Sequence, residues 1–168
     1  MEFLWSPWRS TYIDSFKSQG ANKEETCFIC EGIQSAGEDS QRLILQRRDH
    51  CVIMMNKYPY TTGHLLIAPL RHIGDYTELS NDELLDILKA VRDSISIIDK
   101  VLSPQGYNMG VNIGKAAGAG LPGHIHFHLV PRWSGDKNFM SVIGETNIIS
   151  FSNEDIYKKL KECYDKIG

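Results

Sequence analysis

The sequence predicts an α+β protein with a mainly antiparallel sheet. Short apolar runs separated by turn residues occupy the middle of the chain, one long amphipathic segment follows them, and further strand-like runs come after it. The 168 residues, 42% hydrophobic and 23% charged, have the size and composition of one compact domain. We therefore expect a single domain over residues 1–168, with an N-terminal arm (1–26) and a C-terminal extension (140–168).

The first predicted elements are two strands joined by a turn. Segments 51–55 (CVIMM) and 65–68 (LLIA) are continuous apolar runs, and Pro59 and Gly63 lie between them. This arrangement is typical of an antiparallel pair. The polar segment 33–41 (IQSAGEDSQ) that precedes them is predicted to be a surface loop.

A long helix is predicted to begin after Ser80. Ser80 and Glu83 have the spacing of a capping box, in which each side chain binds the backbone N–H of the other residue. Pro104 and Gly106 end the pattern. Between these limits one apolar stripe, predicted to pack on the sheet, consists of Leu84, Leu88, Val91, Ile95, Ile98 and Leu102.

Two more strands and a second helix complete the predicted fold. Segments 107–113 and 125–130 have the composition of strands. A short amphipathic helix at the C-terminus is indicated by Ile156, Leu160, Cys163 and Ile167.

Charge and hydropathy exclude several classes of partner. The net charge of -3 and the pI of about 6.1 argue against nucleic acid, which demands a broad basic surface. No apolar run approaches the length needed to cross a membrane, and the opening MEFLWSPWRS does not resemble a secretory signal. We expect a cytoplasmic protein whose four cysteines stay reduced.

The segment GHIHFHLVPRW places His124, His126 and His128 at alternate positions of a predicted strand. Alternate side chains share one face, so the three imidazoles should lie in a row while Ile125, Phe127 and Leu129 face the core. Two chemistries fit this row. Three imidazoles suit a catalytic zinc with an open fourth position, whereas a central imidazole flanked by donors suits nucleophilic attack on phosphorus.

A glycine-rich loop precedes the histidines. The segment 112–120 (NIGKAAGAG) has glycines at 114, 118 and 120, which let backbone amides approach a phosphate, and Asn112 and Lys115 offer further donors. This loop favours phosphate chemistry and makes Gly118 and Gly120 candidate nucleotide-binding residues.

Cys27 and Cys30 form a CxxC pair. Such a pair supplies two thiolates to a zinc ion, acts as a redox couple, or is simply buried. The residues after it are predicted to be a loop, which does not favour the thioredoxin-like reading.

The segment HIHFHLV resembles the His-x-His-x-His-x-x motif of the histidine triad (HIT) family of nucleotide hydrolases and transferases. The resemblance extends to MNKYPYTTGHLLIAPLRHIGDYTEL and to GVNIGKAAGAGLPGHIHFHLVPRWSGDKNF, and so covers about 27–139. LWSPWR and PRWSGDKNF are similar to the branch that hydrolyses or phosphorolyses diadenosine tetraphosphate (Ap4A). The resemblance to this family implies a HIT-like fold with five strands, an adenosine nucleotide substrate and a homodimer.

The resemblance also assigns roles. His126 would attack the α-phosphorus and form a nucleotidyl-histidine intermediate, with its other nitrogen held by a backbone carbonyl near His124. His128 would contact phosphoryl oxygens or the leaving group, Asn112 the phosphate, and Asn56 the ribose hydroxyls. The segment 119–123 (AGLPG) departs from the family because it lacks the polar pair that usually precedes the histidines. This leaves open whether water or phosphate is the acceptor, and whether the protein is a nucleotide-binding regulator with incidental turnover.

Zinc-bearing members of the family use two cysteines and two histidines. By that resemblance His72 and His124 would join Cys27 and Cys30 in a structural zinc site, which leaves His126 free to attack. No organic cofactor is implied.

Overall fold

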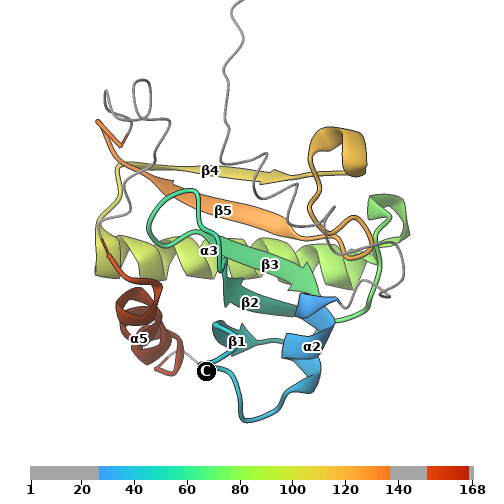
Figure 1. The fold of residues 1–168 in the computed structure, drawn as a ribbon, viewed down its shortest axis with the longest axis horizontal. Helices are drawn as coiled ribbons and strands as arrows, with labels where there is room; N and C mark the ends of the chain where they lie inside the picture. Colours follow the sequence, from blue (N-terminus) through green and yellow to red (C-terminus); the bar gives the residue numbers. More distant parts are fainter. Residues whose placement is uncertain (1–26, 137–150, 167–168) are drawn as a thin grey trace, which may run out of the picture.

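The computed structural model describes residues 27–136 and 151–166, so the predicted arm, with LWSPWR, and part of the C-terminal extension lie outside it. The described chain forms a five-stranded sheet with helices around it (Figure 1). The elements are α2 (Phe28–Gln34), β1 (Ile44–Arg47), β2 (Cys51–Met55), β3 (Leu65–Pro69), η1 (Tyr76–Glu78), α3 (Asn81–Leu102), β4 (Gly106–Val111), η2 (Lys115–Ala117), β5 (Phe127–Arg132) and α5 (Asn153–Tyr164).

The strands follow the order β1-β2-β3-β5-β4, and every neighbouring pair is antiparallel. The predicted α+β class with an antiparallel sheet is therefore confirmed. Helix α3 runs along one face of the sheet, α2 lies on the other, and α5 lies beside β1 (Figure 1). No described helix combines the length and apolarity that a bilayer crossing requires.

The two faces of the sheet separate the apolar residues into two clusters. Ile53, Leu65 and Leu129 face α3 and belong to the main core, as do Ile125 and Phe127. Val52, Met54, Leu66 and Ala68 face α2 and form a second cluster with Ile29 and Ile44. The histidines that alternate with Ile125 and Phe127 therefore lie on the α2 side.

Helix α3 begins as predicted. Both bonds of the capping box between Ser80 and Glu83 are present, and the helix ends at Leu102 with Ser103 in the left-handed region. The predicted stripe was wrong in one respect, because Leu88 is 54% exposed. The buried face instead includes the small residues Ala90 and Ser94, which let the helix approach its neighbours closely.

Two elements were not predicted from the residue pattern. Helix α2 occupies Phe28–Gln34, where we expected loop-like residues, and β1 covers Ile44–Arg47. Both are short, and α2 depends on contacts from elsewhere: Arg47 donates to the carbonyls of Gly32 and Ile33 at its C-terminal end. Strand β5 begins at Phe127, two residues later than predicted, so His124 and His126 precede the strand.

Candidate functional site

The geometry of His126 fixes which of its nitrogens can react. Its Nδ1 lies 2.9 Å from the carbonyl oxygen of His124, and a carbonyl can only accept, so Nδ1 carries the proton. The lone pair is therefore on Nε2. Burial lowers the pKa of this ring, which keeps it neutral near pH 7. His126 has the tautomer that a nitrogen nucleophile needs.

His128 is held in the complementary tautomer by His64. The backbone N–H of Tyr60 points at His64 Nδ1 (3.2 Å), so that nitrogen accepts, and a neutral His64 carries its proton on Nε2. His64 Nε2 lies 3.0 Å from His128 Nδ1 and therefore donates to it. The proton of neutral His128 must then be on Nε2.

The Nε2 atom of His128 is buried and has no hydrogen-bond partner among the described residues. A buried donor left unpaired costs about 1–3 kcal/mol, so the site is incomplete without an acceptor. The ring centroids of His126 and His128 are 5.1 Å apart. A phosphoryl group within reach of both Nε2 atoms would meet a lone pair from His126 and an N–H from His128.

Burial and neighbouring imidazoles keep this group of rings neutral. Burial, with smaller contributions from His128 and His126, lowers the pKa of His64 to about 3. Burial and His126 lower the pKa of His128 to about 4. Both rings are uncharged at pH 7, which makes the deduced proton positions stable.

His64 was not among the site residues that the sequence indicated. It is fully buried and lies two residues before Leu66, which is paired with His128. His64 and Leu66 are alternate residues of one extended segment, so their side chains share a face of the sheet, and this spacing was visible in the sequence. It indicated the site only once the register of β3 with β5 was known. Tyr60 stacks on His64 with centroids 4.7 Å apart and covers the ring from outside.

Asn56 lies beside this pair at the end of β2. Its Nδ2 is 3.3 Å from His64 Nδ1, and its Oδ1 accepts from the Tyr58 amide at 2.9 Å. An amide group has a second N–H and a second lone pair, so Asn56 retains one donor and one acceptor for a ligand.

The glycine-rich loop is ordered by its own bonds. The amides of Ala117, Gly118 and Ala119 donate to carbonyls of the same loop, and Asn112 Nδ2 lies 3.4 Å from the Gly118 oxygen. Gly118 takes a positive φ of 88°, which favours glycine. Gly120 is exposed at the end of the loop. In this arrangement the Gly118 amide is engaged within the loop.

A cavity of about 980 Å³ opens beside His128. Its lining includes Tyr60, Asn112 and Arg132. Arg132 forms a forked ion pair with Asp136, so its charge is already matched. The cavity is large enough for a ligand of drug size or more.

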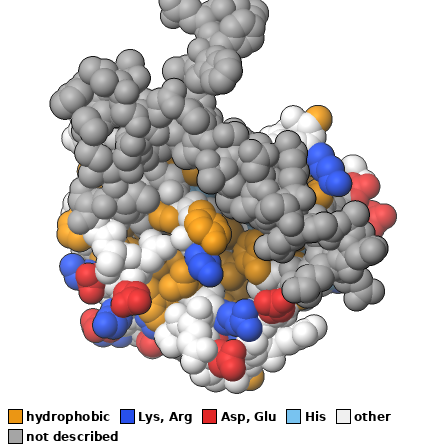
Figure 2. Space-filling view, viewed as in Figure 1, with side chains coloured by type: hydrophobic (Ala, Val, Ile, Leu, Met, Phe, Trp, Pro, Cys, Tyr) orange, Lys and Arg blue, Asp and Glu red, His pale blue; other side chains and the backbone are white. Residues whose placement is uncertain are grey.

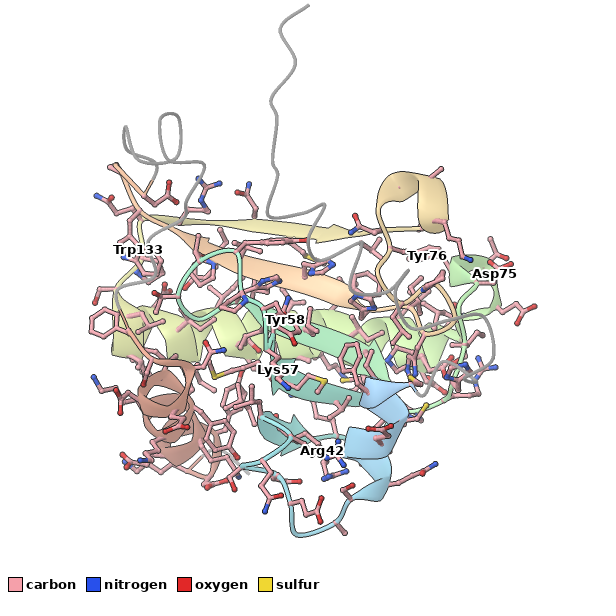
Figure 3. The ribbon with its side chains drawn as sticks, viewed as in Figure 1. Arg42, Lys57, Tyr58, Asp75, Tyr76 and Trp133 are labelled. Atoms are coloured by element: carbon pink, nitrogen blue, oxygen red, sulfur yellow. The ribbon has the colours of Figure 1, made fainter. Side chains whose placement is uncertain are left out.

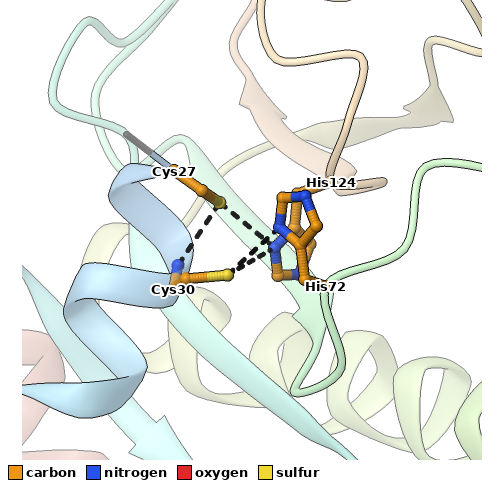
Figure 4. Close-up of side chains that lie close together, drawn as sticks. All are labelled: Cys27, Cys30, His72 and His124. Carbon is orange, nitrogen blue, oxygen red and sulfur yellow. Dashed lines mark hydrogen bonds between the residues drawn. The ribbon is translucent and has the colours of Figure 1, made fainter. Parts of the chain in front are cut away.

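Cys27, Cys30, His72 and His124 converge in a second cluster (Figure 4). One ligand atom from each lies within 4.8 Å of the others. His124 Nε2 donates to the Pro69 carbonyl at 2.9 Å, so its Nδ1 lone pair faces the thiols, at 3.2 Å from Cys27 Sγ. His72 Nδ1 lies 3.2 Å from Cys30 Sγ. Two sulfur and two imidazole donors are a set that suits tetrahedral zinc.

Each part of the cluster is anchored to the fold. Cys27 is the N-cap of α2, and its sulfur accepts from the Cys30 amide. The chain after His72 binds the chain after His124 through the Ile125 amide and the Ile73 carbonyl (2.7 Å). These ties bring the four donors close to one another.

His124 belongs to both sites. Its ring faces the thiols, whereas its carbonyl fixes the tautomer of His126. Within residues 27–136 and 151–166, the group with metal-binding geometry contains His124 but neither His126 nor His128. This favours the cysteine-histidine set over a zinc held by the three histidines.

Known proteins are similar to this chain in sequence and in fold. The HIT domain family model matches residues 37–135. The AP-4-A phosphorylase of Mycobacterium tuberculosis is 31% identical over 154 residues, covering 89% of this chain and 77% of that relative. The asymmetrical bis(5'-nucleosyl)-tetraphosphatase of Schizosaccharomyces pombe is 35% identical over 82 residues, covering 49% of this chain and 44% of that relative. A Zn-bound histidine triad family protein from Mycobacterium smegmatis has a TM-score of 0.66 at 22% identity, covering 84% of this chain and 95% of that one.

The chain therefore belongs to the HIT family. Within that family it is similar to the Ap4A-like branch, as the sequence predicted.

Proposed function

We propose that this protein is a nucleotide hydrolase or transferase that cleaves dinucleoside polyphosphates at the α-phosphate. The observation that carries the proposal is the pair of opposite tautomers: His126 presents a lone pair on Nε2, and His128 presents an unpaired, buried Nε2–H. The names of the mycobacterial and fission yeast relatives support the substrate class.

The first step forms a bond between His126 Nε2 and the α-phosphorus. The bond from that phosphorus to the bridging oxygen breaks, and its electron pair leaves with the rest of the polyphosphate. The Nε2–H of His128 donates to an oxygen on which charge develops. The proton of His126 stays on Nδ1 and is donated in a hydrogen bond to the His124 carbonyl oxygen, which stabilises the positive charge that the ring acquires.

In the second step an acceptor oxygen attacks the same phosphorus and the nitrogen–phosphorus bond breaks. Water gives a nucleoside monophosphate, and inorganic phosphate gives a nucleoside diphosphate. The proposal includes both acceptors, and their products distinguish them in the assay.

The remaining donors bind the nucleotide. Asn56 keeps one donor and one acceptor, which match the ribose hydroxyls, and Asn112 lies in the cavity that contains His128. The apolar cluster that contains Val52, Met54 and Leu66 is buried beneath α2, and none of these three side chains is more than 4% exposed. Figure 2 shows apolar side chains gathered in the middle of this face of the molecule, with charged side chains among and below them.

A structural zinc ion is the second part of the proposal. Cys27, Cys30, His72 and His124 would hold it, and it would stiffen the segment that carries His126 instead of activating water. A homodimer is the third part. It is supported by the position of β4 at the end of the sheet and by exposed apolar side chains on α3 and β4, namely Leu85, Leu88 and Met109.

The test is the reaction with diadenosine tetraphosphate, with and without phosphate. His126→Ala should abolish turnover and keep about one bound zinc per chain, whereas Cys30→Ser should lose the metal. If His126→Ala retains full activity, the nucleophile is misassigned. If it loses zinc, the metal is held by the three histidines. Tight nucleotide binding without cleavage by the wild type would make the protein a binding regulator instead.

A further inference from the structure

The turn between β2 and β3 carries residues of the candidate site at both ends. Asn56 begins it and His64 ends it, and the Asn56 amide donates to the His64 carbonyl at 2.9 Å. Lys57 and Tyr58 follow Asn56 and lie over the middle of the sheet in the view of Figure 3. The positions of Asn56 and His64 therefore depend on what holds the backbone of this turn.

Asn153 binds that backbone from the C-terminal helix. Its Nδ2 lies 3.3 Å from the carbonyl oxygen of Asn56 and 3.3 Å from that of Lys57. An amide nitrogen has two hydrogens, so both are committed to these consecutive carbonyls. Asn153 lies outside residues 37–135, which the HIT domain model matches.

Helix α5 is a rigid support for this contact. Ile156 and Leu160 are buried in the main core. The hydroxyl of Tyr157 donates to the Ile44 carbonyl (2.9 Å), and that of Tyr164 donates to Ser94 Oγ (2.6 Å). Because these anchors lie on β1 and α3, α5 cannot follow a movement of the turn.

We propose that Asn153 is a positioning residue of the nucleotide site. It fixes the backbone of Asn56 so that the Asn56 side chain meets the ribose without first being ordered. This rests on the proposed function. Preorganising a binding group lowers the entropy lost on binding, so the effect should appear in substrate affinity more than in the chemical step.

Asn153→Asp tests the contact and spares the helix. A carboxylate has no hydrogen to donate and repels the two carbonyl oxygens. A negative charge in the first turn of a helix is favourable, so α5 should persist. The matched control is Ser152→Ala, which removes the N-cap bond to Asp155 and weakens the same helix without touching the turn.

The expected result for Asn153→Asp is a KM for diadenosine tetraphosphate raised about tenfold, the equivalent of one or two lost hydrogen bonds, with kcat within about twofold. Amide hydrogen exchange in residues 57–62 should become faster in this variant only. A Ser152→Ala variant that raises KM equally, or an Asn153→Asp variant with unchanged KM, overturns the proposal. A wild type that neither binds nor cleaves the nucleotide instead overturns the function on which it rests.

Discussion

The link between His64 and His128 gives the most informative prediction about the chemistry. In the His64→Phe variant, the Nε2–H that now donates to His128 Nδ1 over 3.0 Å is lost. His128 can then carry its proton on Nδ1, which leaves a lone pair where the proposed mechanism needs a donor. The variant keeps an aromatic ring under Tyr60, so the packing loss is small.

The size of the effect follows from one lost donor at the reacting group. An unpaired buried polar group costs about 1–3 kcal/mol, which corresponds to a fall in kcat of about 5- to 150-fold. His64→Gln is the matched variant, because its side-chain amide can still donate to His128 Nδ1. We expect it to recover most of the lost rate.

The assay is steady-state turnover of diadenosine tetraphosphate by the three proteins at pH 7.5, with thermal unfolding measured in parallel. A His64→Phe variant that folds and keeps kcat within about twofold of the wild type would refute the tautomer argument. So would a Gln variant no faster than the Phe variant.

Two further predictions concern stability. Folding lowers the pKa of His64 from 6.5 to about 3. Above pH 6.5 the ring is neutral in both the folded and the unfolded protein and does not oppose folding. As the pH falls below 6.5 the ring is protonated in the unfolded protein first, so the free energy of unfolding decreases. At pH 5 this ring should lower the free energy of unfolding by about 2 kcal/mol. Denaturant unfolding at pH 5 and pH 8 should therefore show a larger loss of stability for the wild type than for His64→Phe. An equal change in unfolding free energy between the two pH values in both proteins would contradict this prediction. Gly74→Ala would place a Cβ 2.4 Å from the Pro122 carbonyl oxygen and push the chain beside His72 away from that beside His124. We expect a loss of about 1–3 kcal/mol and weaker zinc binding, measured against Gly106→Ala, where a Cβ meets no atom within 4 Å.

The sequence predicted those elements of the fold that depend on residues close together in the chain. The capping box at Ser80 and the paired runs 51–55 and 65–68 depend on neighbouring residues alone, and the structure has them where they were expected. Helix α2 was missed because its seven residues are stabilised by Arg47, which is distant in the sequence. The exposure of Leu88 was missed because periodicity does not say which of two adjacent stripes a sheet will cover.

In the candidate site, too, local motifs were visible in the sequence, whereas those motifs did not show which distant segments come together. The alternation of three histidines was compatible with zinc or with phosphate chemistry, and the glycine-rich loop favoured phosphate. The CxxC pair was compatible with a metal site, and each of these motifs is a local arrangement of reactive groups. The family resemblance then linked Cys27 and Cys30 to His72 and His124, which lie in separate segments of the chain.

What the sequence alone determined is the set of reactive groups and the α+β class, since both depend on residue type and short-range spacing. What only the tertiary structure decided is where the protons lie. The Nε2 of His128 carries a hydrogen because His64, 64 residues away, donates to its other nitrogen, and that contact exists only once β3 and β5 are paired in register. A proton position depends on partners within about 3 Å, and such partners are set by packing instead of by order along the chain.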